Sequence, residues 1–397
     1  MATAPPALRT LVQRYDREVF DPARTGARVR LRGAGTSSWD VLFGPRGPKL
    51  VSSERVRADA VLQADEETWR KLAEDLRGGM EAFRAGRLTV RRDLHLGVGF
   101  LAATAPDTGP GRLCFRHVKT RVASTSYMES GDGPPVVMLH GLGATKASFL
   151  PTVAALTDSH RAIAIDLPGF GDSGKPLRAA YDPAFFAESV VAFLDAMDLD
   201  RVDLVGNSMG GRAAIEVALQ APERIGRLVL LTPSLAWLRS RPWAAPLRLV
   251  PPQLGLIQPA PRQIVEKIVR NVVPGAGENW TAAGVDEFLR SYLSPRGRAA
   301  FYAAARNIYL EAPHGSNGFW TRLPTLQPES LFVWGEYDEL VPKAFARHVA
   351  QALPAARHLT LRCGHVPQLE KPLQTHRAML AFLEGRRTGR AAPKVAA

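Results

Sequence analysis

The stretch VDLVGNSMGGRAAIEVAL, Val202–Leu219, sets three glycines around one serine, between strand-forming residues and a helix-forming sequence. Glycine loses more conformational freedom on folding than any other residue, so this cluster indicates a backbone that turns sharply or approaches another element closely. The letters G-N-S-M-G also match G-x-S-x-G, in which a serine occupies a strained turn between a strand and a helix. The stretch therefore predicts that Ser208 projects from such a turn as a nucleophile.

Apolar runs that alternate with helix-forming stretches continue on both sides of this motif. Such alternation predicts an α/β fold, with a mostly parallel sheet and helices on both faces. The functional loops are then expected at the carboxyl ends of the strands. The strand runs are PVVMLHG (135–141), RAIAIDLPG (161–169), RVDLVGN (201–207), RLVLLTP (227–233), SLFVWGE (330–336) and RHLTLRCGH (357–365), and the helices are Pro183–Met197, Met209–Gln220 and Pro342–Leu353.

The alternation lapses over residues 234–324, which read as several short helices with prolines and many aromatic residues. An insert at the functional edge of a sheet is a natural lid, so the segment is predicted to form a helical cap. Its aromatic residues include Trp237, Trp243, Trp280, Phe288, Phe301, Tyr302, Tyr309, Phe319 and Trp320.

A serine hydroxyl is a poor nucleophile at neutral pH and needs a base, which an acid in turn orients. Asp338 follows the run SLFVWGE and His365 follows the last run, giving the chain order Ser…Asp…His. His365 is expected to take the Ser208 proton while Asp338 fixes the tautomer of His365. Structural alternatives exist, since Ser208 could cap a helix and His365 could be an ordinary loop histidine. The three residues in this order favour a catalytic triad.

The loop MLHGLG, residues 138–143, follows the first strand run and completes the expected site. An oxyanion hole normally joins an amide of this loop to the amide after the nucleophile, which predicts Leu142 and Met209 as the donors. The supporting residues are predicted to be His140, which braces the loop, with Gly141, Gly143 and Asn207. Asp166 in DLPGFGDS is expected to anchor a loop, and Cys363 to be a small packed residue.

Residues from about Leu113 to Leu383 resemble an α/β-hydrolase with a helical cap, because HGLG, DLPGFGDSGKP, GNSMGG, WGEYDELVP and GHVPQLEKP occur in family order. The resemblance implies an ester-type hydrolase. Haloalkane dehalogenases and epoxide hydrolases of this family carry aspartate where this chain has Ser208. Carbon–carbon bond hydrolases share GNSMGG but often have tryptophan after the catalytic histidine, where this chain has Val366; they remain an alternative.

The Pro- and Gly-rich stretch ATAPDTGPGR, Ala103–Arg112, divides the chain into residues 1–104, a linker over 105–112 and residues 113–397. The first part reads as meandering strands, a helix with an acidic first turn, a Gly-Gly break, a second short helix, a strand and an apolar helix. From about Val29 to Ala103 it resembles a type-two sterol carrier protein domain, which implies a hydrophobic tunnel for fatty-acyl or sterol-like ligands. The alternative is a module whose own side chains fill that space, used for packing or dimerisation.

The overall composition argues against several classes of function. The 397 residues carry a formal charge of +13, but the arginines are scattered among acids, which indicates a solvated basic surface rather than a nucleic-acid site. Weak contact with an anionic membrane remains open. Two cysteines give neither a disulfide framework nor a thiolate metal cluster, and the first residues lack a signal-peptide pattern. We therefore expect a cytoplasmic protein that needs no cofactor or metal; the sequence assigns no oligomeric state.

The combined hypothesis is a serine hydrolase of lipophilic carboxylic esters, such as acyl or sterol-like esters. Two alternatives remain: a carbon–carbon bond hydrolase of ring-fission products, and a lipid-binding protein with a non-catalytic hydrolase fold.

Overall fold

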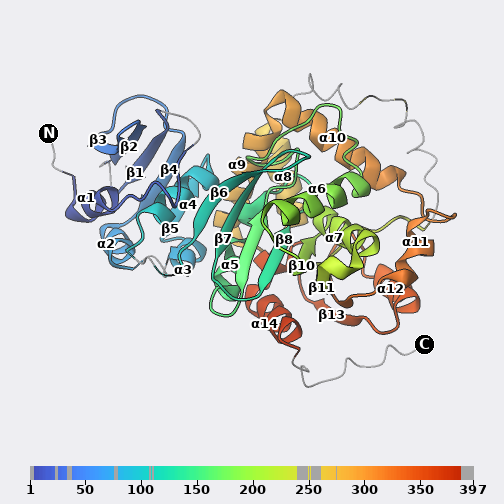
Figure 1. Cartoon of the computed structure of the whole chain (residues 1–397). Coiled ribbons are helices and arrows are strands. Elements are labelled where there is room, and N and C mark those ends of the chain that lie inside the picture. Colours follow the sequence, from blue (N-terminus) through green and yellow to red (C-terminus); the bar gives the residue numbers. More distant parts are fainter. Residues whose placement is uncertain are drawn as a thin grey trace.

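The computed structural model describes residues 4–22, 26–33, 38–75, 79–106, 109, 111–238, 249, 251, 261–273 and 275–385. These residues form an eight-stranded sheet with helices on both faces and, beside it, a separate five-stranded sheet built from the first part of the chain (Figure 1). No helix among the described residues is both long and apolar enough to cross a membrane.

The eight-stranded sheet has the order β13-β12-β11-β10-β8-β9-β7-β6. In this order, all neighbouring strands from β13 through β8 to β9 pair in parallel. Strand β7 pairs antiparallel with β6 and β9. Each of the six predicted strand runs forms a strand, so the mostly parallel sheet is confirmed. The strands are β6 (Cys114–Lys119), β7 (Ser124–Ser130), β8 (Pro135–Leu139), β9 (Arg161–Ile165), β10 (Val202–Asn207), β11 (Ile225–Leu231), β12 (Glu329–Gly335) and β13 (Arg357–Leu361).

Alternate residues of the central strands pack into different cores, because successive side chains of a strand point to opposite faces. Val136 and Met138 of β8 belong to an apolar cluster with Val153 and Met379, from helices α5 and α14. The neighbouring β8 residues belong to a second cluster with residues of helices α6, α7 and α12. The helices are α5 (Leu150–Leu156), α6 (Pro183–Ala196), α7 (Met209–Gln220), α12 (Phe345–Ala352), α13 (Pro367–Glu370) and α14 (Pro372–Leu383).

Two of the predicted helices agree closely with the structure, and the third is shorter than expected. The predicted helix Pro342–Leu353 begins only at Phe345. Short 3-10 turns also occur at η2 (Lys146–Phe149), η3 (Pro222–Arg224) and η6 (Leu323–Thr325).

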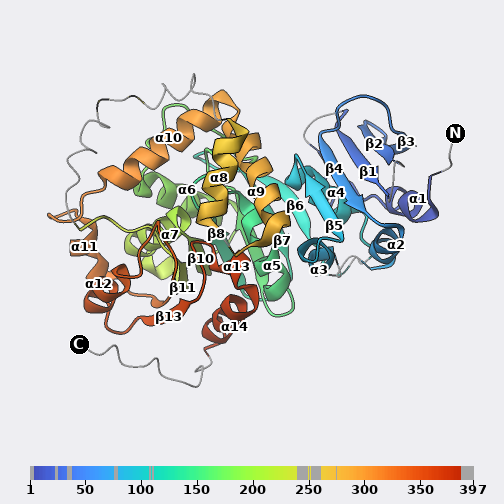
Figure 2. The same cartoon turned by 180° about the vertical axis from the view of Figure 1, so that it is seen from behind.

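The described part of the predicted cap is mostly helical, and it lies over one edge of the sheet (Figure 2). Two of its helices have 16 residues each, so the expectation of only short helices is wrong. Residues 239–248, 250, 252–260 and 274, which include Trp243, lie outside the described residues. The described cap helices are α8 (Arg262–Val272), α9 (Gly277–Tyr292), α10 (Pro295–Leu310) and α11 (Phe319–Arg322).

The five-stranded sheet, with the helices around it, is called the N-terminal unit below. Its strand order is β3-β2-β1-β4-β5; β1, β2 and β3 pair antiparallel in succession as a meander does, but β1 pairs parallel with β4, where the predicted meander is wrong. Helix α1 and strand β3 were not anticipated. The elements are α1 (Pro6–Gln13), β1 (Arg28–Arg32), β2 (Ser38–Gly44), β3 (Gly47–Ser52), β4 (Ala60–Ala64), α2 (Glu66–Glu74), α3 (Gly79–Arg84), β5 (Leu88–Arg91) and α4 (Leu94–Ala103).

The N-terminal unit lies beside the β6 edge of the large sheet, and both views place α4 next to that edge (Figures 1 and 2). Its apolar interior forms one continuous cluster with the core under α5 and α14. The expected linker over 105–112 lies partly outside the described residues, since 107, 108 and 110 are not described. At its end, Arg112 is tied back to the unit, with its Nη1 2.7 Å from the Asp16 carboxylate.

Candidate active site

Ser208 lies in the turn between β10 and α7, as the sequence predicts. Its backbone has φ 52° and ψ −117°, an arrangement that residues with a side chain rarely adopt. The Ser208 amide donates to the Leu231 carbonyl oxygen at 3.0 Å, and the Ser208 carbonyl accepts from the Ser234 amide at 2.9 Å. These bonds hold the strained turn between β10 and α7.

The glycines of the opening motif are explained by close backbone approach. A Cβ atom at Gly206 would lie 2.4 Å from the carbonyl oxygen of Gly210, and a Cβ at Gly210 would lie 2.1 Å from that of Leu139. Both distances are far shorter than a non-bonded contact allows. Strand β10, helix α7 and strand β8 can therefore meet this closely only without side chains at these positions.

Asp338 and His365 come together although 27 positions separate them. His365 Nδ1 lies 2.8 Å from Asp338 Oδ2, and both side chains are buried. The other oxygen, Asp338 Oδ1, accepts hydrogen bonds from the amides of Leu340 and Val341 at 2.9 and 3.0 Å. Both carboxylate oxygens are thus engaged, which fixes the imidazole ring in one orientation.

The loop that carries His365 is held from two sides. The buried Glu370 carboxylate accepts from the amides of Gly364 at 2.8 Å and Val366 at 2.9 Å. Asn207 Nδ2 donates to the His365 carbonyl oxygen at 3.1 Å, so the serine turn and the histidine loop are directly joined. Asn207 was expected to support the site; Glu370 was not singled out, although it lies within the motif GHVPQLEKP.

The HGLG loop lies against the serine turn. A Cβ atom at Gly141 would lie 3.2 Å from Ser208 Cβ, and Gly143 has a φ of 74°. The fully buried His140 ring has its Nδ1 2.8 Å from the Gly141 carbonyl oxygen, and its Nε2 accepts from the Leu167 amide at 3.0 Å. Burial lowers the pKa of His140, so the ring is neutral. These contacts support the expected bracing role.

The two predicted oxyanion donors belong to the HGLG loop and to the position directly after Ser208. Leu142 lines the same cavity as Ser208. Met209 is the first residue of α7, and amides in the first turn of a helix have no intrahelical acceptor. Both positions are therefore compatible with amides aimed at the serine.

Asp166 anchors its loop, in agreement with the sequence-based expectation. Its carboxylate accepts from the Lys146 amide at 2.7 Å and lies 2.6 Å from Lys146 Nζ, with both side chains buried. It also accepts from the Asp172 amide at 2.9 Å. Cys363 is buried as expected, and burial raises its pKa to about 12, so the thiol stays protonated.

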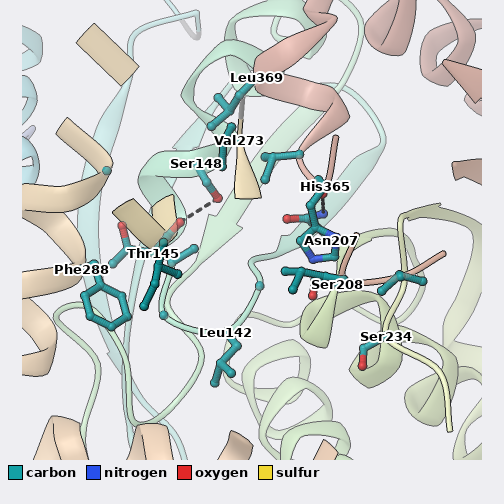
Figure 3. Close-up of a pocket in the computed structure, with 18 of the residues that line it drawn as sticks. Leu142, Thr145, Ser148, Asn207, Ser208, Ser234, Val273, Phe288, His365 and Leu369 are labelled. Carbon is teal, nitrogen blue, oxygen red and sulfur yellow. Dashed lines mark hydrogen bonds between the residues drawn. The ribbon is translucent and has the colours of Figure 1, made fainter. Parts of the chain in front are cut away.

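A cavity of about 380 Å³ opens at Ser208 and His365. Figure 3 shows the His365 ring turned toward Ser208, with Leu142 and Phe288 on the loop and cap sides. Most of the lining is apolar and comes from the cap and the carboxyl edge of the sheet, including Leu142, Trp237, Val265, Trp280, Phe288, Phe301, Val341, Phe345 and Leu369. Over the described part of the chain, no group of three or more His, Cys, Asp or Glu side chains is arranged to hold a metal ion.

Residues 134–372, more than half of the chain, match the model of the alpha/beta hydrolase fold family. The chain belongs to this family, and it is an enzyme, a hydrolase. The match begins at residue 134, so the sterol-carrier-like character of the N-terminal unit stays a prediction.

Among the relatives, a 2-hydroxymuconate semialdehyde hydrolase from a Pseudomonas strain is 29% identical over 66% of this chain and 89% of its own length. The acetyltransferase component of an acetoin cleaving system from Pseudomonas putida is 30% identical over 63% of this chain. This chain spans only 64% of that relative. A solved structure, a membrane phospholipase A described as a bacterial virulence factor, shares 27% identity and a TM-score of 0.57, over 79% of this chain and 95% of the other.

Proposed function

We propose that the protein is a serine hydrolase of carboxylic esters with a lipophilic acyl group, acting through Ser208, His365 and Asp338. The observation that carries the proposal is the strained serine turn opening, together with His365, into an apolar cavity of about 380 Å³. Esters with short polar acyl groups would leave most of this cavity unfilled.

The acylation half-reaction follows from the orientation of His365. Asp338 engages Nδ1 of the ring, which leaves Nε2 as the basic nitrogen. Ser208 Oγ bonds to the ester carbonyl carbon while its proton passes to Nε2, and the Leu142 and Met209 amides stabilise the oxyanion. The carbon–oxygen bond to the alcohol then breaks, and Nε2 returns its proton to the departing alkoxide. The products are the free alcohol and an acyl group on Ser208.

Deacylation runs the same steps with water. His365 Nε2 takes a proton from water as the water oxygen bonds to the acyl carbon, and the oxyanion forms again beside the same two amides. The bond to Ser208 Oγ breaks and Oγ regains a proton from Nε2. The carboxylic acid leaves, and the enzyme is restored without any cofactor taking part.

The substrate class rests on the apolar lining of the cavity. Each methylene of an acyl chain transferred from water into such a lining contributes about 0.8 kcal/mol. A chain of eight to twelve carbons would therefore gain appreciable binding energy over acetate. The similarity to a structure named as a phospholipase A supports a lipophilic ester.

Turnover of p-nitrophenyl butyrate and dodecanoate by wild type and Ser208→Ala tests the proposal. The variant is expected to lose roughly three to six powers of ten in kcat, and fluorophosphonate labelling should disappear with it. Ser189→Ala, a matched change at a buried serine on α6, should retain full activity. Equal ester turnover by wild type and Ser208→Ala would overturn the proposal.

A second candidate is a hydrolase of carbon–carbon bonds in ring-fission products, which the likeness to the 2-hydroxymuconate semialdehyde hydrolase favours. It would use the same residues but act on coloured dienols. Loss of dienol absorbance at a kcat/KM well above that for any p-nitrophenyl ester would favour this second function over the first.

The lipid ligand expected from the sterol-carrier resemblance is part of the proposal as well. Native mass spectrometry of the purified chain would detect a co-purifying fatty acid or sterol. A lipid retained in Ser208→Trp, in which the catalytic cavity is obstructed, would place the ligand in the N-terminal unit.

A further inference from the structure

Helix α4 joins the N-terminal unit to the rest of the molecule. It contacts β4 and β5 of its own sheet and also β6 of the large sheet and α9 of the cap. Its first turn is fixed because the Asp93 carboxylate accepts from the Leu96 amide at 2.8 Å, capping the helix. The amino end of α4 is therefore a rigid point close to the cap.

Leu94, the first residue of α4, reaches the catalytic cavity. Its side chain is 4% exposed, and it lines the same cavity as Ser208 and His365. Among the described residues around this cavity, Leu94 alone comes from the N-terminal unit. The N-terminal unit thus supplies one piece of the apolar wall.

The cap helix that forms the neighbouring wall is docked on the N-terminal unit. Asp286 of α9 accepts from Arg91 Nε at 2.7 Å and from the Arg92 amide at 2.8 Å. Asn279 Nδ2 donates to the Phe83 carbonyl oxygen at 2.7 Å. The Phe83 and Trp280 rings meet edge to face at 5.0 Å, and Trp280 itself lines the cavity.

A partly buried ionic cluster joins the three parts of the molecule at the same place. The Arg290 guanidinium of α9 lies 2.6 Å from the Asp172 carboxylate of the large-sheet part and 2.7 Å from Glu287 of the cap. It also lies 3.7 Å from Asp93, the residue that caps α4. Separating α4 from α9 would break up this partly buried cluster, so the cluster favours a defined relative position of the two helices.

Part of the interior of the N-terminal unit is filled by its own side chains. Val29, Leu31, Val41 and Leu62, from three of its strands, are fully buried in the apolar cluster that continues into the large-sheet part. The cavity to which the unit contributes is instead the one that Ser208 lines.

We propose that α4 of the N-terminal unit is a wall of the catalytic cavity and that Leu94 sets the length of the apolar acyl chain that the cavity admits. This deepens the proposed ester hydrolysis and rests on it. The N-terminal unit then acts as a specificity element for the hydrolase.

The test compares two leucines of the same helix. Leu94 and Leu96 are 4% and 5% exposed, but only Leu94 lines the cavity. Leu94→Ala is expected to raise the ratio of kcat/KM for p-nitrophenyl dodecanoate over butyrate about three- to tenfold, and Leu94→Trp to lower it at least about tenfold. Leu96→Ala, which removes the same atoms from an equally buried site, should leave the ratio unchanged.

A second measurement tests the role of Leu94 in the cavity wall without depending on catalysis. Displacement of the fluorescent probe 8-anilinonaphthalene-1-sulfonate by dodecanol and by butanol reports the cavity without turnover. Dodecanol affinity should fall in Leu94→Trp but not in Leu96→Ala. If wild type hydrolyses no ester but this affinity changes as stated, the proposed function fails and the wall role stands. Equal shifts in both leucine variants, or none in the Leu94 variants, would overturn the wall role.

Discussion

The carboxyl edge of the large sheet and the N-terminal unit contribute to the same cavity in different ways. At the edge, Ser208 follows directly on β10, and Asp338 and His365 lie within four residues of the ends of β12 and β13, so short stretches of backbone place them. The N-terminal unit reaches the cavity through Leu94 and through contacts between residues far apart in sequence, such as Arg91 and Asp286, which are 195 positions apart. The first region carries out the proposed chemistry, and the second shapes the space beside it.

This difference predicts that substitutions in the two regions have different kinetic effects. Changes at the edge should lower kcat and affect all substrates alike, because every ester uses the same reacting atoms. Changes in the N-terminal unit should alter selectivity among acyl chains and the stability of the contact between the unit and the cap. A substitution at the edge that altered acyl-chain selectivity, or one in the N-terminal unit that lowered kcat equally for all esters, would contradict this division.

Apart from Ser208→Ala, the largest effect is expected for Asp338→Asn. The Leu340 and Val341 amides hold the oxygen of the asparagine side chain, so its NH₂ group faces His365 Nδ1 and the ring loses the tautomer that leaves Nε2 basic. The kcat for p-nitrophenyl butyrate and dodecanoate should fall about 10⁴-fold for both esters. Asp200→Asn, at an exposed position, should have no effect. A fall confined to the longer ester would contradict the proposed division.

The edge of the sheet was largely predictable from the sequence, for a physical reason. Apolar runs that alternate with helices define a parallel sheet, and the G-x-S-x-G turn needs its glycines for backbone packing that the structure displays at Gly206 and Gly210. The pairing of Asp338 with His365 follows because parallel strands end at one edge. Local sequence therefore indicated both the fold and the candidate triad.

The remaining features depend on tertiary contacts that have no local pattern. The parallel pairing of β1 with β4 and the docking of α9 on Arg91 and Phe83 each join distant stretches. Glu370 lies inside a motif, but only the folded loop shows its carboxylate accepting two amides beside His365. Such positioning roles can be recognised only in the folded structure.

Glu370→Gln tests a positioning residue at the edge, with an intermediate effect. The buried carboxylate receives the Gly364 and Val366 amides on separate oxygens, and the glutamine NH₂ would face one of these donors. Displacement of His365 by about 1 Å should lower kcat roughly 10- to 100-fold, with KM nearly unchanged for both esters. Glu188→Gln, on the exposed face of α6, is the control. A raised KM with unchanged kcat would show that Glu370 acts through the cavity instead.

Glu287→Gln should have the smallest effect, at the contact between the cap and the N-terminal unit. Burial raises the pKa of Glu287 to about 7, against the opposing effect of Arg290; Asp93 and Asp172 also face it and raise the pKa further. Below its ordinary pKa both folded and unfolded chains hold the proton. Between that value and about 7, the folded chain binds more protons, so the free energy of unfolding falls as pH rises through this window.

The glutamine has no proton to lose, so the variant should lack this part of the pH dependence. Urea unfolding at pH 5, 6, 7 and 8 should show wild type losing on the order of 1 to 3 kcal/mol that Glu287→Gln retains. Glu278→Gln, at an exposed position of the same helix, should follow wild type. Because Asp93 and Asp172 face Glu287, the difference between the curves reports Glu287 together with these two neighbours. Parallel curves for Glu287→Gln and wild type would mean that the carboxyl is already ionised in the folded chain, with Arg290 outweighing burial. The contact between the cap and the N-terminal unit would then be fully ionised. Added salt should weaken this contact, and lowering the pH should not strengthen it.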